Sequence, residues 1–148
     1  MRIPGSPVYL DASALAKIYI AEEGSEELEA ALLDRRDLIV SDLSVSELTS
    51  ALVRRVRETE LAASHAQRVY QRVLRDVTAG EFRGAELTSE VHREAERLLM
   101  SLGRQVALRA ADALHLALAG LQGARVLVTF DRRMGAAART LGTFELPV

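Results

Sequence analysis

The sequence contains no cysteine, and this absence excludes three kinds of site at once. A disulfide framework, a thiol nucleophile and a zinc site with cysteine ligands all need that residue. Lysine is almost as rare, because Lys17 is the only one and arginine supplies the remaining basic charge. The net charge of −2 neither indicates nor excludes a nucleic-acid partner, since a local basic stripe can coexist with an acidic pocket.

Long apolar runs and glycine-rich phosphate-binding loops are also missing. No apolar run reaches membrane-spanning length, and Met1–Pro7 lacks the features of a signal peptide. We therefore expect a cytoplasmic protein with no membrane partner. No dinucleotide-binding or Walker-type motif follows any predicted strand, which argues against a nucleotide cofactor.

Short apolar runs alternate with helical patterns along the 148 residues, and no linker or repeat divides them, so we expect a single domain over residues 1–148. Strands are predicted at Val8–Leu10, Asp37–Ser41, Phe82–Leu87 and Val126–Thr129, with a last edge strand at Thr143–Leu146. Helices are predicted at Ser13–Ile20, Ser25–Arg36, Ser44–Glu58, Leu61–Val77, Ser89–Leu102, Ala110–Leu121 and Asp131–Leu141. Strands separated by helices predict a three-layer α/β/α domain with a central, mainly parallel sheet.

One predicted helix carries a charge where the pattern is otherwise apolar. The segment Ala110–Leu121 consists almost entirely of alanine and leucine, which is typical of a buried helix, yet it contains Asp112. A buried carboxylate is costly unless it is paired or binds a metal ion. Either Arg109, three positions earlier, forms a salt bridge with it, or Asp112 shares a cation with other carboxylates. His115 is expected to be a packed or hydrogen-bonded core histidine rather than a metal ligand.

Three further acidic residues occupy positions from which side chains reach the crevice of a parallel α/β domain. Asp11 closes the first strand, Asp131 follows the last clear core strand, and Glu47 lies in the first turn of the helix Ser44–Glu58. Four converging carboxylates repel one another, and a hard cation such as Mg²⁺ or Mn²⁺ relieves that repulsion. The chemistry that such a site suits is metal-assisted hydrolysis of a phosphodiester.

Each of these residues also has an ordinary structural role to weigh. Asp131 either joins the site or merely caps the helix that follows it. Glu47 either joins the site or completes a capping box with Ser44. Ser13 and Thr129 either support Asp11 or a metal-bound water, or act as routine caps.

Four motifs together carry a resemblance to a known family. The segments YLDASAL (9–15), SELTSAL (46–52), LRAADALHLALA (108–119) and LVTFDRR (127–133) resemble the PIN-domain ribonucleases, and more narrowly the VapC toxins of bacterial toxin–antitoxin pairs. The resemblance spans essentially the whole chain. Carried over position by position, it implies a metal-binding acidic quartet and two supporting hydroxyls. The quartet is Asp11, Glu47, Asp112 and Asp131, and the hydroxyls are those of Ser13 and Thr129.

The resemblance further implies an activity and partners. Such a protein cleaves RNA with Mg²⁺ or Mn²⁺ and a metal-activated water, forms a homodimer, and is silenced by a cognate antitoxin encoded beside it. The helix pair in Ser44–Val77 would then help to form the dimer and the antitoxin groove. Its arginines Arg68, Arg72 and Arg75 form a stripe that either tracks a phosphate backbone or is a solvated face.

Two other functions remain open on the sequence. One is another metal-dependent nuclease or phosphoryl-transfer enzyme, although a haloacid-dehalogenase-type phosphatase would have an aspartate where Ser13 stands. The other is a catalytically silent PIN-like binding module. The presence of all four carboxylates argues against it.

Overall fold

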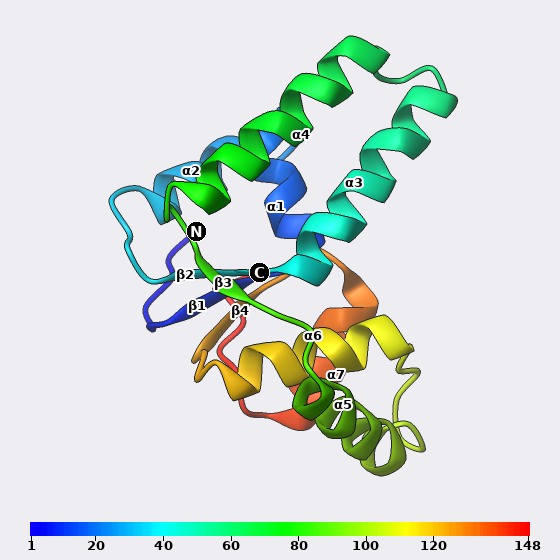
Figure 1. Cartoon of the computed structure of the whole chain (residues 1–148). Helices are drawn as coiled ribbons and strands as arrows, with labels where there is room; N and C mark the ends of the chain where they lie inside the picture. The colour runs from blue at the N-terminus through cyan, green and yellow to red at the C-terminus, as the bar shows by residue number, and fades with distance from the viewer.

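A computed structural model describes residues 1–148 and contains one parallel sheet of four strands in the order β3-β2-β1-β4. The strands are β1 (Val8–Leu10), β2 (Leu38–Ser41), β3 (Arg83–Ala85) and β4 (Val126–Val128). The helices are α1 (Ala12–Tyr19), α2 (Ser25–Leu32), α3 (Asp42–Arg57), α4 (Ala63–Thr78), α5 (Ser89–Leu102), α6 (Ala110–Leu121) and α7 (Arg132–Leu141). The predicted three-layer α/β/α fold is confirmed, with α1–α4 on one face of the sheet and α5–α7 on the other (Figure 1).

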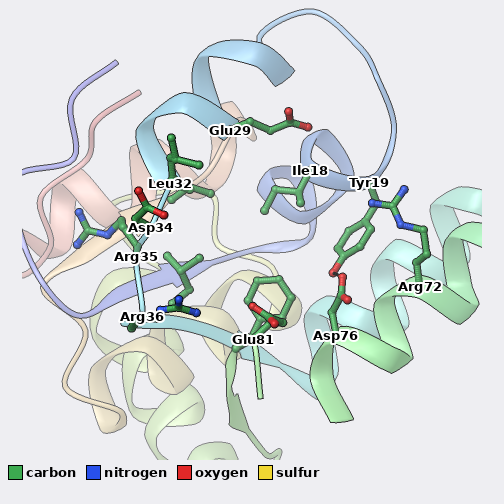
Figure 2. Close-up of a pocket in the computed structure, with 13 residues that line it drawn as sticks. Ile18, Tyr19, Glu29, Leu32, Asp34, Arg35, Arg36, Arg72, Asp76 and Glu81 are labelled. Carbon is green, nitrogen blue, oxygen red and sulfur yellow. Dashed lines mark hydrogen bonds between the residues drawn. The ribbon is translucent and has the colours of Figure 1, made fainter. Parts of the chain in front are cut away.

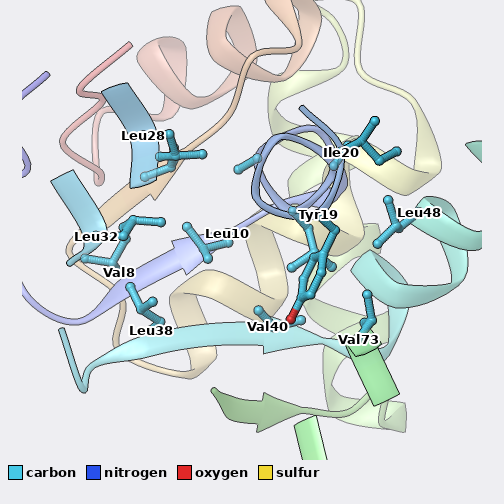
Figure 3. Close-up of a cluster of buried hydrophobic side chains, with 14 of the residues drawn as sticks. Val8, Leu10, Tyr19, Ile20, Leu28, Leu32, Leu38, Val40, Leu48 and Val73 are labelled. Atoms are coloured by element: carbon cyan, nitrogen blue, oxygen red, sulfur yellow. The ribbon is translucent and has the colours of Figure 1, made fainter. Parts of the chain in front are cut away.

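The central strand β1 supplies residues to two separate hydrophobic cores, because successive side chains of a strand point to opposite faces. Val8 and Leu10 pack with residues of α1–α4, and Figure 3 shows this cluster beside Tyr19. Tyr9, between them, packs with residues of α5–α7, together with Leu127 of β4. Both β2 and β4 pair with β1, so the ends of these three strands lie side by side.

Helix α3 begins earlier than the sequence pattern predicted. Its N-cap is Ser41, whose Oγ accepts a hydrogen bond from the backbone nitrogen of Ser44 at 3.0 Å. Glu47 therefore lies in the second turn rather than the first, and the capping box with Ser44, which the sequence offered as an alternative role for Glu47, does not form. The hydroxyl of Ser44 instead donates to the carbonyl oxygen of Leu10, which joins the helix to β1.

Several other predicted elements are shorter than expected. Strand β3 covers Arg83–Ala85 rather than Phe82–Leu87. Helix α2 ends at Leu32 rather than Arg36, because the chain turns through Asp34, which has a φ of 62°. The predicted edge strand Thr143–Leu146 is reduced to a single parallel bridge between Val126 and Glu145. None of the seven helices is both long enough and apolar enough to cross a membrane.

Helices α3 and α4 form an antiparallel pair whose connecting turn lies away from the sheet (Figure 1). The pair is tied to α1 by the hydroxyl of Tyr19, which donates a hydrogen bond to Asp76 of α4. The guanidinium of Arg72 lies 5.3 Å from the centroid of the Tyr19 ring, in cation–π geometry. These two contacts hold helix α4 of the pair against α1.

Candidate active site

The candidate site residues gather at the carboxyl edge of the sheet. Asp11 directly follows β1, and Thr129 and Asp131 follow the neighbouring strand β4. Asp112 lies in the first turn of α6, and Glu47 in the second turn of α3, which follows β2. This is the edge where parallel α/β domains carry their ligand sites.

Asp11 is buried and accepts hydrogen bonds on both carboxylate oxygens. It caps α1, where Oδ1 accepts hydrogen bonds from the Ala14 backbone nitrogen at 3.0 Å and from Ser13 Oγ at 2.6 Å. Thr129 donates to Oδ2, and the Phe130 backbone nitrogen donates to Ser13 Oγ at 2.8 Å. Burial raises the pKa of Asp11, and the hydrogen bonds from Ser13 and Thr129 oppose that rise. The two hydroxyls thus fix this carboxylate between the ends of β1 and β4.

Asp131 has the capping role that the sequence offered as an alternative. Its Oδ1 accepts hydrogen bonds from the backbone nitrogens of Arg133 at 2.8 Å and Met134 at 3.2 Å, at the start of α7. Its own backbone nitrogen donates to Thr129 Oγ1 at 3.1 Å. The second oxygen, Oδ2, takes no part in the cap and points to other partners.

Asp112 forms the salt bridge with Arg109 that the sequence offered as one of two explanations. The carboxylate is buried, with 3% of the residue exposed. One guanidinium nitrogen of Arg109, Nη2, lies 3.2 Å from Asp112 Oδ1 and also 3.2 Å from Asp131 Oδ2. The hydrogen bond to Asp112 raises the pKa of Arg109, and Asp131 adds to this effect. One arginine therefore links two candidate carboxylates.

Glu47 contacts a network of buried polar side chains that does not extend to the other three carboxylates. Its Oε1 contacts Nε2 of His115, a buried residue of α6. The other ring nitrogen of His115, Nδ1, lies 2.7 Å from the Tyr9 hydroxyl, which in turn lies 2.8 Å from Ser41 Oγ. The prediction that His115 is a hydrogen-bonded core histidine is confirmed. Tyr9 was not singled out, although a tyrosine in a buried strand needs a polar partner.

The four carboxylates are not packed together. Arg109 joins Asp112 to Asp131, and Thr129 contacts both Asp11 and the backbone of Asp131, whereas Glu47 shares no partner with these three. No three histidine, aspartate or glutamate side chains of the chain lie close enough together to hold a metal ion between them. The possible metal ligands Asp11, Glu47, Asp112 and Asp131 offer oxygen atoms only. His115 adds no nitrogen ligand, because both of its ring nitrogens are engaged in hydrogen bonds. Oxygen ligands of this kind suit a hard divalent cation such as Mg²⁺ or Mn²⁺.

A separate pocket of about 480 Å³ lies by Leu38, at the opposite end of β2 (Figure 2). Tyr19, Arg72 and Asp76 line it, and none of the candidate site residues does. All three arginines of the predicted stripe on α4 are exposed, but Arg72 is engaged with the Tyr19 ring. The stripe is thus exposed, with one member held in place, and both interpretations of it stay predictions.

The family of the chain follows from comparison with known proteins. A family model described as the PIN domain matches residues 8–140. The chain therefore belongs to the PIN-domain family. Over 143 residues it is 37% identical to Ribonuclease VapC45 of Mycobacterium tuberculosis, and the match covers 95% of this chain and 94% of that protein. Within the family, the chain is thus of the VapC type.

Solved structures from several organisms share the fold. The VapC20 toxin of Mycobacterium tuberculosis, described as cleaving the sarcin–ricin loop, matches with a TM-score of 0.67 at 17% identity, over 88% of this chain and 94% of that one. PAE2754 of Pyrobaculum aerophilum matches with a TM-score of 0.66 at 25% identity, over 89% of this chain and 79% of that one. The VapBC2 structure of Rickettsia felis, bound to a DNA fragment from its promoter, matches with a TM-score of 0.64 at 13% identity, over 94% and 96%.

Proposed function

We propose that this protein is a metal-dependent endoribonuclease, the toxin of a toxin–antitoxin pair, that hydrolyses RNA phosphodiester bonds. The observation that carries the proposal is the pair of buried carboxylates, Asp11 and Asp112, at the carboxyl edge of the sheet. Buried carboxylates are stabilised by a compensating positive charge, and a metal-dependent nuclease holds its cation between carboxylates. The ribonuclease names of its relatives support RNA as the substrate.

Asp11, Glu47, Asp112 and Asp131 would hold the cation, Mg²⁺ or Mn²⁺. When bound, such an ion stabilises negative charge on a phosphate under attack and lowers the pKa of the attacking water. Ser13 and Thr129 keep both oxygens of Asp11 in one orientation, because each hydroxyl donates to a different oxygen. The two hydroxyls thus keep the Asp11 carboxylate in a fixed position for binding the cation.

The proposal is tested by the cleavage of RNA by the purified protein in Mn²⁺, in EDTA, and with the substitution Asp112→Asn. We expect discrete cleavage by the parent in Mn²⁺, none in EDTA, and at least a hundredfold slower cleavage by the variant, in the usual range for losing a group that stabilises transition-state charge. Asn keeps the volume of the side chain and removes only its charge.

The matched control is Asp34→Asn. Asp34 is exposed and has a φ of 62°, a conformation that asparagine also tolerates. The Asp34→Asn variant should cleave RNA at the parental rate. Cleavage that persists in EDTA, or an Asp112→Asn variant as fast as the parent, would contradict a metal site at Asp112.

We further propose a cytoplasmic homodimer with a protein antitoxin as its partner. Neighbouring structures described as toxin–antitoxin or VapBC complexes support the antitoxin. Val53 of α3 is 55% exposed and Leu74 of α4 is 41% exposed, which leaves apolar surface on the helix pair. Light scattering of the purified chain tests the dimer. Co-purification with the product of the neighbouring reading frame, and loss of RNA cleavage in that complex, tests the antitoxin.

A further inference from the structure

Arg109 occupies the position between two candidate metal ligands. It is the N-cap residue of α6, and 53% of its side chain is exposed, whereas Asp112 is almost fully buried. Its Nη2 lies 3.2 Å from an oxygen of each carboxylate, and its Nε lies 3.3 Å from Asp112 Oδ2. The guanidinium therefore places a positive charge against both Asp112 and Asp131.

Asp112 and Asp131 each accept hydrogen bonds from backbone nitrogens on one oxygen, and the other oxygen of each accepts only from the guanidinium of Arg109. Asp131 Oδ1 accepts from the first turn of α7, and Asp112 Oδ2 accepts from the Arg109 backbone nitrogen at 3.1 Å. The other two oxygens, Asp112 Oδ1 and Asp131 Oδ2, have the guanidinium as their hydrogen-bond donor. A cation that bridges these two oxygens competes with the guanidinium, which bridges them in this structure.

No other part of the protein holds the arginine side chain. About half of it is exposed, and its guanidinium has no protein partner other than these two carboxylates. An arginine fork released at the edge of a carboxylate site is suited to a phosphate group, which it binds in bidentate geometry.

We propose that Arg109 is a tethered cation of this site: it holds Asp112 and Asp131 in the metal-free protein, gives them up to the metal ion, and then contacts a phosphate of the RNA. This inference rests on the proposed function. Arg109 is thus a positioning residue that competes with the metal ion before it helps to bind the substrate.

The first test is the affinity for Mn²⁺, measured from the free Mn²⁺ signal in electron paramagnetic resonance, for the parent, Arg109→Gln and Arg132→Gln. Arg132 is an exposed arginine next to Asp131 that forms no salt bridge with a site carboxylate, so its substitution removes the same charge from the same region. Exposed ion pairs contribute little each, so we expect roughly threefold tighter Mn²⁺ binding for Arg109→Gln, and less than half of that gain for Arg132→Gln.

The second test follows the guanidinium itself. In nitrogen-15-labelled parent protein, the Nε–H signal of Arg109 should move toward the position of a free arginine as Mg²⁺ is added, while that of Arg132 stays in place. At saturating Mn²⁺, Arg109→Gln should raise the KM for RNA at least threefold, about the loss of one exposed charged contact. Arg109→Lys keeps the charge without the fork and should restore only part of that KM.

The outcomes separate this inference from the proposed function. If the parent binds Mn²⁺ and cleaves RNA, but Arg109→Gln binds Mn²⁺ more weakly or equally, the arginine only orients the carboxylates and the inference is wrong. Tighter Mn²⁺ binding with an unchanged KM would also overturn it, because the contact with phosphate would then be absent. If the parent binds no Mn²⁺ at all, the metal-dependent function fails, and this inference fails with it.

Discussion

The hydroxyl of Tyr9 connects the hydrophobic core to the candidate site. Tyr9 is fully buried, and its hydroxyl lies between Ser41 Oγ and His115 Nδ1. Burial raises the pKa of Tyr9 well above its usual value, so the phenol is neutral at physiological pH. Since His115 contacts Glu47 through its other nitrogen, the position of this glutamate depends on a group inside the core.

We predict that Tyr9→Phe lowers the free energy of unfolding by about 1–3 kcal/mol, because His115 Nδ1 then has no hydrogen-bond partner in the core. It should also slow RNA cleavage through a less ordered Glu47. Urea denaturation measures the first effect and a cleavage assay the second. Tyr70→Phe is the control, since the Tyr70 hydroxyl makes no hydrogen bond within the chain and should be neutral in both assays. A stable, fully active Tyr9→Phe variant would refute the link between Tyr9 and Glu47.

At the scale of elements, the segment before β1 is packed against the start of β4. The carbonyl oxygen of Pro7 accepts hydrogen bonds from the backbone nitrogens of Arg125 at 2.9 Å and Val126 at 3.2 Å. Gly5 approaches so closely that a Cβ atom there would lie 2.6 Å from Val126 Cγ2. Only a residue without a side chain fits this position, because Val126 is itself fully buried.

We predict that Gly5→Ala destabilises the protein by about 1–3 kcal/mol, the usual cost of overpacking a core. Gly84→Ala, on the edge strand β3, is the matched control, because a Cβ atom there would meet nothing within 4 Å. It should be neutral or slightly stabilising. Thermal unfolding of the two variants gives the comparison, and equal melting temperatures would mean that the chain around Gly5 yields without cost.

At the scale of the whole molecule, the candidate ligands come from four different parts of the chain. Asp11 follows β1, Glu47 belongs to α3, Asp112 to α6, and Asp131 precedes α7. A cation that binds all of them has its full affinity only for the folded chain. Binding and folding are then coupled.

We therefore predict that Mn²⁺ raises the melting temperature of the metal-free protein. At a concentration about 100 times the Kd the gain is about 2.7 kcal/mol, which for a chain of this size corresponds to roughly 5–10 °C. Differential scanning calorimetry measures the shift. Asp112→Asn should lose most of it and Asp34→Asn none. An unchanged melting temperature of the parent in millimolar Mn²⁺ would contradict the proposed site.

Much of the fold could be predicted from sequence because its signals are local. The alternation of apolar runs with helical patterns is a property of neighbouring residues, and the parallel three-layer sheet follows from it. The positions of Asp11 and Asp131 at strand ends follow in the same way. The predicted start of α3 was wrong because two serines in the segment are both suitable as N-cap residues. The sequence pattern favoured a start at Ser44, whereas Ser41 caps the helix.

The sequence by itself therefore determined the fold class, the family motifs and the edge of the sheet at which the acidic residues lie. Only the tertiary structure decided which of their atoms have partners. Arg109 lies 3 positions before Asp112 but 22 positions before Asp131, and Tyr9 and His115 are 106 positions apart. Such contacts depend on how strands and helices are placed in space, and no local pattern of side chains encodes them.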